Sequence, residues 1–158
     1  MTAEIGRVLS VAARSGRLGC VLLEQGRLLG WTTSERGARS ATAAARRLQG
    51  WIDSFGPQVL VSENPDAPCR KGGRQKANLR AFLSVVEELP LRHLVVTRQR
   101  RFGNIYLEAE DLARQFPQLA PEVPKKPPIW KHEPYRLVIF EALALVRDAG
   151  LLGEDDTE

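Results

Sequence analysis

The first third of the chain contains three short apolar segments separated by turn-forming residues. Residues 7–12, 18–24 and 27–33 are rich in Val and Leu, and each has the length of a strand. Arg14-Ser15-Gly16 and Gln25-Gly26 separate them. Because such short connections join antiparallel neighbours, this region is predicted to form a three-stranded antiparallel meander.

From residue 40 the apolar positions change to helical spacing. Ser40 is a suitable N-cap for a helix over 41–54, and Gly56-Pro57 is a strong stop signal after it. Residues 58–63 then form a continuous apolar run that ends in a charge. A run of this kind is typical of a parallel strand that is buried on both faces.

The remainder of the chain alternates between helix and strand. Helical spacing indicates helices at 76–88, 106–115 and 134–149, and residues 92–97 have the pattern of a fifth strand. We expect the Pro-rich connector 117–128 to cross the surface in extended form. The last helix is so apolar that it is expected to pack on the core.

This order of elements predicts an α/β fold. We expect a five-stranded mixed sheet, in which an antiparallel three-stranded meander continues into two parallel strands, with helices on both faces. The first strand should be central, between the second and the fourth. Residues 1–150 are expected to form one domain, followed by an acidic tail at 151–158.

Composition narrows the class of protein. Of the 158 residues, 43% are hydrophobic and 27% are charged, which is typical of a globular domain. No apolar run approaches the ~18 residues that span a bilayer, so no membrane partner is expected. The N-terminus does not have the layout of a secretory signal, and two cysteines make no disulfide framework. We therefore expect a cytoplasmic protein.

Positive charge is concentrated in two segments. The chain carries a formal net charge of +4 with a pI of about 9.4, and residues 67–80 and 92–101 contain basic residues without any acid. Arg and Lys beside glycines suit contacts to phosphates, although a solvated surface is the alternative. The candidate nucleic-acid-binding residues are Arg70, Lys71, Arg74, Lys76, Arg98, Arg100 and Arg101. The expected partner is DNA or RNA; the oligomeric state stays open, with a homodimer among the alternatives.

Three short segments resemble a known family. Val8-Leu9-Ser10-Val11-Ala12-Ala13 is followed by Leu18-Gly19-Cys20-Val21, a buried strand ends in Ser62-Glu63, and the last helix contains Phe140-Glu141-Ala142-Leu143-Ala144. Together with the order of elements, these segments are similar to RuvC-like resolvases of the RNase H-like superfamily. The resemblance implies a metal-dependent nuclease whose catalytic and metal-binding positions here are Glu63 and Glu141, with Mg²⁺ or Mn²⁺ as cofactor.

The sequence departs from this family at two acidic positions. The family's first-strand Asp corresponds to Ala12, and an acid one turn before the last-helix acid corresponds to Val138. Two-metal cleavage requires carboxylates around both ions, and an alanine methyl provides no ligand. Whether the chain is an enzyme therefore stays open. Each remaining Glu has a second interpretation as an acid that pairs with a nearby cation.

Three functions remain in consideration. The preferred one is a nucleic-acid-binding protein with a degenerate metal-nuclease centre. The first alternative is an active, resolvase-like endonuclease in which Glu63 and Glu141 recruit another acid such as Glu4, Asp66 or Glu133. The second alternative is a protein-interaction module on the same fold.

Overall fold

The computed structural model describes residues 6–14, 16–67, 71–99, 102–125, 127, 134 and 136–152. Its centre is a five-stranded sheet in the order β3-β2-β1-β4-β5. The strands are β1 (Arg7–Arg14), β2 (Arg17–Glu24), β3 (Arg27–Ser34), β4 (Val59–Glu63) and β5 (Arg92–Val96). The first three are antiparallel, and β4 runs parallel to both β1 and β5. The predicted α/β fold, with the first strand in the centre, is confirmed.

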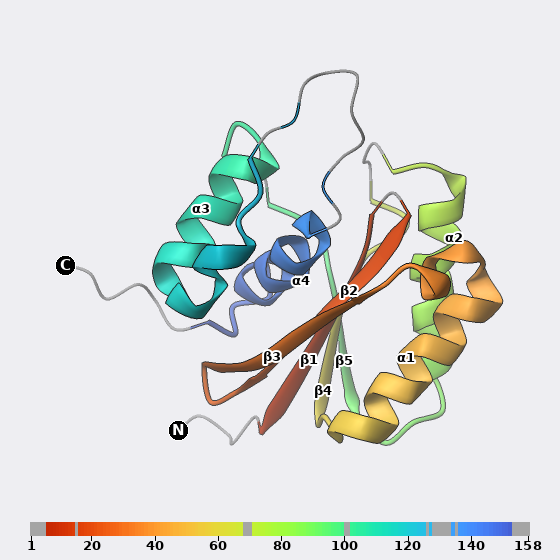
Figure 1. Cartoon of the computed structure of the whole chain (residues 1–158). Coiled ribbons are helices and arrows are strands. Elements are labelled where there is room, and N and C mark those ends of the chain that lie inside the picture. The colour runs from red at the N-terminus through yellow and green to blue at the C-terminus, as the bar shows by residue number, and fades with distance from the viewer. Residues whose placement is uncertain are drawn as a thin grey trace.

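Helices cover both faces of this sheet and make three layers (Figure 1). Helices α1 (Ala41–Phe55) and α2 (Gly73–Val86) pack on one face, and α3 (Ile105–Gln115) and α4 (Leu137–Asp148) pack on the other. Alternate residues of β1 enter opposite cores: Leu9 and Val11 face α1 and α2, whereas Val8 and Ala12 face α3 and α4. This explains why the strand has a continuous apolar run.

Local signals in the sequence explain several element boundaries. The Ser40 hydroxyl accepts a hydrogen bond from the Ala43 amide, and α1 ends at Gly56 in the left-handed conformation, as predicted. Gln25 and Gly26 both have positive φ angles, as a two-residue hairpin turn requires. Helix α4 is buried along Leu137–Val146, which confirms that the last helix belongs to the core.

Two predicted segments differ from the structure. Helix α2 begins at Gly73 rather than at residue 76, with Gly72 as its N-cap in an extended conformation, so Arg74 and Gln75 belong to its first turn. The connector after α3 is not extended over its first part: Pro117–Glu122 forms a 3-10 helix, η2. Pro117 suits the first turn of a helix because its missing N–H would be unpaired there, and buried Leu119 anchors this turn to the core.

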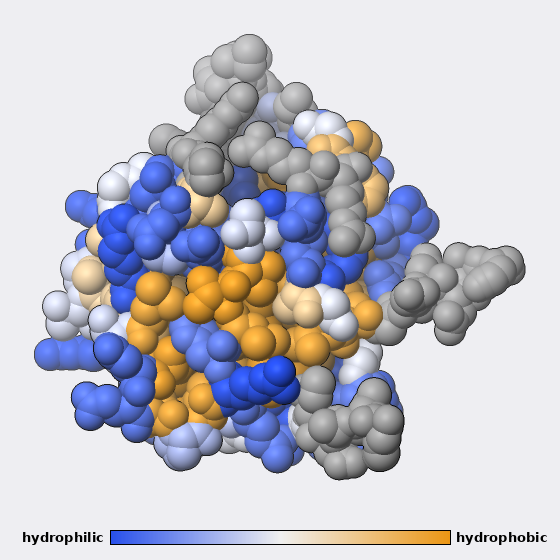
Figure 2. Space-filling view, turned by 180° about the vertical axis from the view of Figure 1, so that it is seen from behind, coloured by the Kyte–Doolittle hydropathy of each residue, from blue (hydrophilic) through white to orange (hydrophobic). Residues whose placement is uncertain are grey.

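One edge of the sheet has little cover. β5 is the last strand in the sheet, and its Val95 is 47% exposed. Seen from behind, the molecule shows a broad apolar area surrounded by polar side chains (Figure 2). Among the described residues, no helix is long and apolar enough to cross a membrane.

Candidate functional site

Glu63 and Glu141 come together at one end of the sheet, as the topology predicts. Glu63 is the last residue of β4, and Glu141 lies in α4, which crosses the sheet above β1. The buried hydroxyl of Ser10 in β1 donates a hydrogen bond to the carbonyl oxygen of Ala142, at 2.6 Å, which holds α4 against the strand. Both Glu side chains are almost completely buried.

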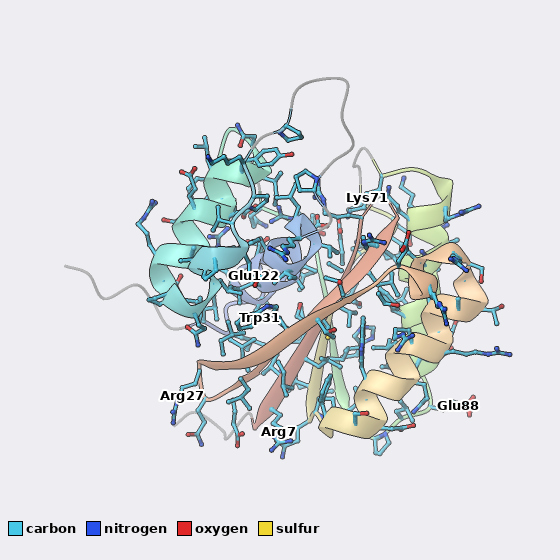
Figure 3. The ribbon with its side chains drawn as sticks, viewed as in Figure 1. Arg7, Arg27, Trp31, Lys71, Glu88 and Glu122 are labelled. Carbon is cyan, nitrogen blue, oxygen red and sulfur yellow. The ribbon has the colours of Figure 1, made fainter. Side chains whose placement is uncertain are left out.

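Lys71 lies between the two carboxylates. Its Nζ is 2.7 Å from Glu141 Oε1 and 3.4 Å from Glu63 Oε1, and it also donates a hydrogen bond to the carbonyl oxygen of Ala13 in β1. Figure 3 shows Lys71 at the end of the sheet opposite to Arg7, which begins β1. One ammonium group therefore binds β4, α4 and the last part of β1 together.

Two arginines complete the surroundings of Glu141. Arg14 Nη1 lies 3.4 Å from Glu141 Oε2, and Arg98 Nε lies 3.3 Å from the same oxygen. Arg98 also binds Glu108 Oε1 at 2.7 Å and Asp148 Oδ2 at 3.3 Å. Each oxygen of Glu141 therefore faces at least one cation.

These contacts form a continuous network, which we call the ion-pair cluster. It extends from β4 to the interface of α3 and α4, where Arg147 pairs with Glu108. Its buried and half-buried members among the described residues are four carboxylates and four cations: Glu63, Glu108, Glu141, Asp148, Lys71, Arg14, Arg98 and Arg147. The formal charges of these eight side chains sum to zero, and Arg147 also lies 3.6 Å from the more exposed Asp111.

The pKa values of the two central carboxyls shift in opposite directions. Burial alone would raise the pKa of Glu141, but the charges of Lys71, Arg14 and Arg98 outweigh burial and lower it to about 2. Burial raises the pKa of Glu63, and the charge of Glu141 adds to that effect although Lys71 opposes it. Glu141 is therefore the strongly paired carboxylate, and Glu63 forms the weaker ion pair with Lys71.

The positions that correspond to the family's other acids lie in apolar packing. Ala12 is completely buried and belongs to the same hydrophobic cluster as Val138. Ala12 pairs with Gly19 in β2, and a Cβ built on Gly19 would lie 2.6 Å from Val138 Cγ1. Helix α4 approaches the sheet so closely here that only small side chains fit opposite Val138.

This donor set does not fit a two-metal centre. Mg²⁺ and Mn²⁺ require several oxygen ligands, and a pair of ions requires carboxylates on more than two sides. Here the oxygens of Glu63 and Glu141 face an ammonium and two guanidinium groups, while Ala12 and Val138 provide no oxygen. Among the described residues, no group of three His, Cys, Asp or Glu side chains could hold a metal ion.

The basic residues expected to bind nucleic acid fall into different environments. Lys71 and Arg98 belong to the ion-pair cluster, with side chains 11% and 19% exposed. Arg74 is exposed and Lys76 half-buried in the first turns of α2. Arg70, Arg100 and Arg101 lie outside the described residues. The nucleic-acid role of all of these residues stays a prediction.

The acids considered for recruitment do not join the cluster where the structure describes them. Asp66 forms a surface ion pair with Arg80 at 3.2 Å, and both side chains are exposed. Glu4 and Glu133 lie outside the described residues. The alternative interpretation of Glu63 and Glu141, as acids paired with nearby cations, agrees with the contacts of Lys71, Arg14 and Arg98.

Sequence reasoning missed several members of the cluster. The sequence pattern predicts that Arg14 lies in a turn, whereas β1 continues to this residue and pairs it with Arg17. Glu108 and Asp148 lie on helices that were predicted correctly, but nothing in the sequence indicated that they share Arg98. One available signal was the position of Glu108 on the apolar side of its helix, where buried Leu112 follows one turn later.

Comparison with solved structures identifies the fold. Thermus thermophilus RuvC aligns with a TM-score of 0.55 at 15% identity, covering 88% of this chain and 90% of that one. The fowlpox virus resolvase, solved with its Holliday junction DNA, gives 0.59 at 10% identity and covers 91% and 99%. The chain has a RuvC-like, RNase H-like fold.

A third neighbour of this RuvC-like chain is the yeast mitochondrial Holliday junction resolvase. It has a TM-score of 0.54 at 10% identity and covers 96% of this chain and 79% of that one. No protein family model matches the sequence, and no curated protein matches it either. At these identities the likeness establishes the fold, and the function has to be argued from the site.

Proposed function

We propose that this protein binds nucleic acid at the end of the sheet where β1 and β4 terminate, and that its acidic centre is not catalytic. The observation that carries the proposal is the position of Lys71, with its ammonium between Glu63 and Glu141. In the two-metal chemistry implied by the resemblance, carboxylates at such positions hold divalent ions. Here the ammonium group of Lys71 neutralises part of their negative charge.

Electrostatics support the non-catalytic interpretation. A divalent ion near Glu141 would have to compete with Lys71, Arg14 and Arg98, which are tied to the protein and are already within 3.4 Å of its oxygens. Repulsion between such an ion and three nearby cations at partly buried positions is strong. We therefore expect weak metal affinity, and no efficient activation of water for phosphodiester cleavage.

Fold and charge support the binding part of the proposal. Two of the similar structures contain Holliday junction DNA. This chain has a net charge of +4, and exposed Arg39 and Arg74 lie near the carboxyl end of β1. Open α/β sheets generally bind their ligands at the carboxyl ends of the strands. Such binding should be largely electrostatic and low in sequence specificity.

The test measures binding and cleavage on the same substrates. Four-way junction, duplex and single-stranded DNA and RNA should bind with an affinity that falls steeply as salt rises, without Mg²⁺- or Mn²⁺-dependent nicking. Binding that is absent at low salt would contradict the proposal and favour the protein-interaction alternative. Efficient nicking that Glu63→Gln abolishes would favour the active endonuclease.

Metal binding provides a second test that does not depend on activity. Titration with Mn²⁺, followed by electron paramagnetic resonance, should detect no saturable site in the parent or in Ala12→Asp, because Lys71 remains between the two Glu residues. The double variant Ala12→Asp with Lys71→Met adds one carboxylate and removes one of the three cations, so it should bind Mn²⁺ more tightly than either the parent or Ala12→Asp. Saturable Mn²⁺ binding by the parent, lost in Glu141→Gln, would show that Lys71 does not exclude the metal.

The endonuclease remains a second candidate because of one feature of the centre. Glu63 and Glu141 do converge, and Glu63 Oε1 is buried without a hydrogen-bond partner among the described residues. Lys71 Nζ is 3.4 Å from this oxygen, which is farther than its 2.7 Å contact with Glu141. An oxygen in this state could accept a metal if Lys71 moved away. The nicking assay on the parent and on Glu63→Gln distinguishes this candidate from the proposal.

A further inference from the structure

A pocket of about 310 Å³ lies next to the ion-pair cluster, on the other side of Arg14. It is bounded by the end of β1, the turn that follows it, the short 3-10 helix η1 (Arg36–Arg39) and the first two turns of α2. We call it the α2 pocket. The side chains that matter for its chemistry are Arg14, Glu35, Arg39, Arg74, Gln75 and Asn78.

The α2 pocket has an excess of positive charge. Arg39 and Arg74 are exposed, and neither makes an ion pair or hydrogen bond to another residue in the described part of the chain. The acid of the lining, Glu35, is paired with Arg17 at 3.0 Å. Arg14 is shared with Glu141. Arg39 and Arg74 therefore have no counterion among the described residues.

Helix α2 adds hydrogen-bond donors to the same wall. Its N-cap is Gly72, which has no side chain to cap the helix, and its first turn contains no acid. The first backbone N–H groups of a helix have no partner within the helix, and they carry partial positive charge. Arg74 and Gln75, which line the pocket, lie in this first turn.

Asn78 provides an independent sign that the pocket accepts a ligand. This residue is only 2% exposed, and its Nδ2 donates a hydrogen bond to the carbonyl oxygen of Ala38 at 3.1 Å. Its Oδ1 has no partner among the described residues. Buried acceptors are normally paired in folded proteins. A pocket lined by two cations without a described counterion, and by a residue whose buried carbonyl oxygen has no described partner, is complementary to a ligand with an anionic group and a hydrogen-bond donor.

We propose that the α2 pocket binds one nucleotide unit, with its phosphate against Arg39, Arg74 and the start of α2 and a hydroxyl or amino group donating to Asn78. The volume is at the lower end of the ~300–1,000 Å³ typical of small-molecule sites, which suits a single nucleotide and is too small for a duplex. The inference rests on the proposed function and deepens it, because it names the part of a nucleic acid that enters this pocket. Free nucleotides and the phosphorylated ends of strands share this chemistry.

Calorimetric titration with small ligands tests the pocket directly. Adenosine 5′-monophosphate should bind, and adenosine, which has no phosphate, should not. Inorganic phosphate should bind about threefold more weakly than the nucleotide, because a phosphate bound to Arg39 and Arg74 cannot also reach Asn78. Replacing both Arg39 and Arg74 by Gln should weaken nucleotide binding at least about tenfold, since charge-assisted hydrogen bonds to phosphate are lost. The matched control is Arg80→Gln, which removes one exposed charge from the same helix outside the pocket and should bind as the parent does.

Competition distinguishes the two sources of the nucleotide. The competitors are a short single strand with a 5′-phosphate and the same strand without it. If only the phosphorylated strand displaces adenosine 5′-monophosphate, the pocket binds the phosphorylated ends of strands. Displacement by neither strand indicates a free nucleotide as the ligand, and both results support the pocket.

Two results would overturn the inference: no binding of the nucleotide at millimolar concentration, or equal binding by the parent and the double variant. The outcome is separable from that of the proposed function. Nucleic acid that binds while the mononucleotide does not would contradict the pocket alone. A mononucleotide that binds while no nucleic acid does would contradict the proposed function and leave the pocket as a site for free nucleotides.

Discussion

The ion-pair cluster and the α2 pocket lie side by side and share Arg14, but their other cations have opposite surroundings. Arg98 contacts three carboxylates and has a side chain that is 19% exposed. Arg74 is exposed and has no ion-pair partner among the described residues. In the sequence both belong to segments rich in Arg and Lys without acids. Basic composition alone therefore does not distinguish a cation that holds the fold together from one that is available to a ligand.

Lys71 and Arg74 make the same contrast at closer range. They are three positions apart in the chain, yet the Lys71 ammonium binds Glu63 and Glu141 while Arg74 lines the pocket. Removing one partner of a buried pair leaves an uncompensated charge, whereas removing an exposed charge costs little. The two groups should therefore differ strongly in how substitution affects stability.

The largest effect is expected for Glu141→Gln. The substitution keeps the shape of the side chain but leaves Lys71, Arg14 and Arg98 without their common carboxylate. We expect the free energy of unfolding to fall by about 3–5 kcal/mol, as measured by urea denaturation. In Asp66→Asn, which breaks the exposed pair with Arg80, the change should stay within about 1 kcal/mol. Similar losses in both variants would show that the cluster is no more important than a surface pair.

A smaller difference is expected between two arginine variants with the same charge change. Arg98→Gln leaves buried Glu108 and Asp148 short of a cation and should cost about 2–4 kcal/mol. Arg74→Gln should change the free energy of unfolding by less than about 0.5 kcal/mol, since it removes no described contact. In binding to DNA the order should reverse, with Arg74→Gln lowering the salt slope by about one unit. A stability loss for Arg74→Gln as large as that for Arg98→Gln would remove the distinction between the two regions.

Acidification should produce the smallest effect in the accessible range. The pKa of Glu141 is held at about 2 in the folded protein, below its usual value of 4.5. A lowered folded-state pKa gives stability that is present above the unfolded pKa and is lost as pH falls through the folded one. The stability difference between the parent and Glu141→Gln should therefore be constant above about pH 5 and narrow between about pH 4.5 and pH 2. A difference that stays constant down to pH 3 would show that Glu141 is not stabilised in its ionised form.

The pattern of residues along the chain predicts the elements, their order and the general position of the acidic centre. Continuous apolar runs require cover on both faces, so the central strands and the buried last helix follow from the pattern of residues. The order of strands then brings the end of the fourth strand and the middle of the last helix to one place. This reasoning predicts that Glu63 and Glu141 converge, and the structure has both within 3.4 Å of the Lys71 ammonium.

Which cations pair with those carboxylates follows from the three-dimensional packing of the elements. Lys71 contacts Glu141 from 70 positions away in the chain, and Arg98 contacts the same residue from 43 positions away. A long, flexible Lys or Arg side chain has no period in the sequence that marks its partner, and its environment depends on which elements pack around it. The same holds for Asn78, whose side-chain amide is buried and donates a hydrogen bond from α2 to η1. Secondary structure and apolar burial can be predicted from the order of residues along the chain. Ion pairs cannot, because they depend on distances between side chains that only the folded structure brings together.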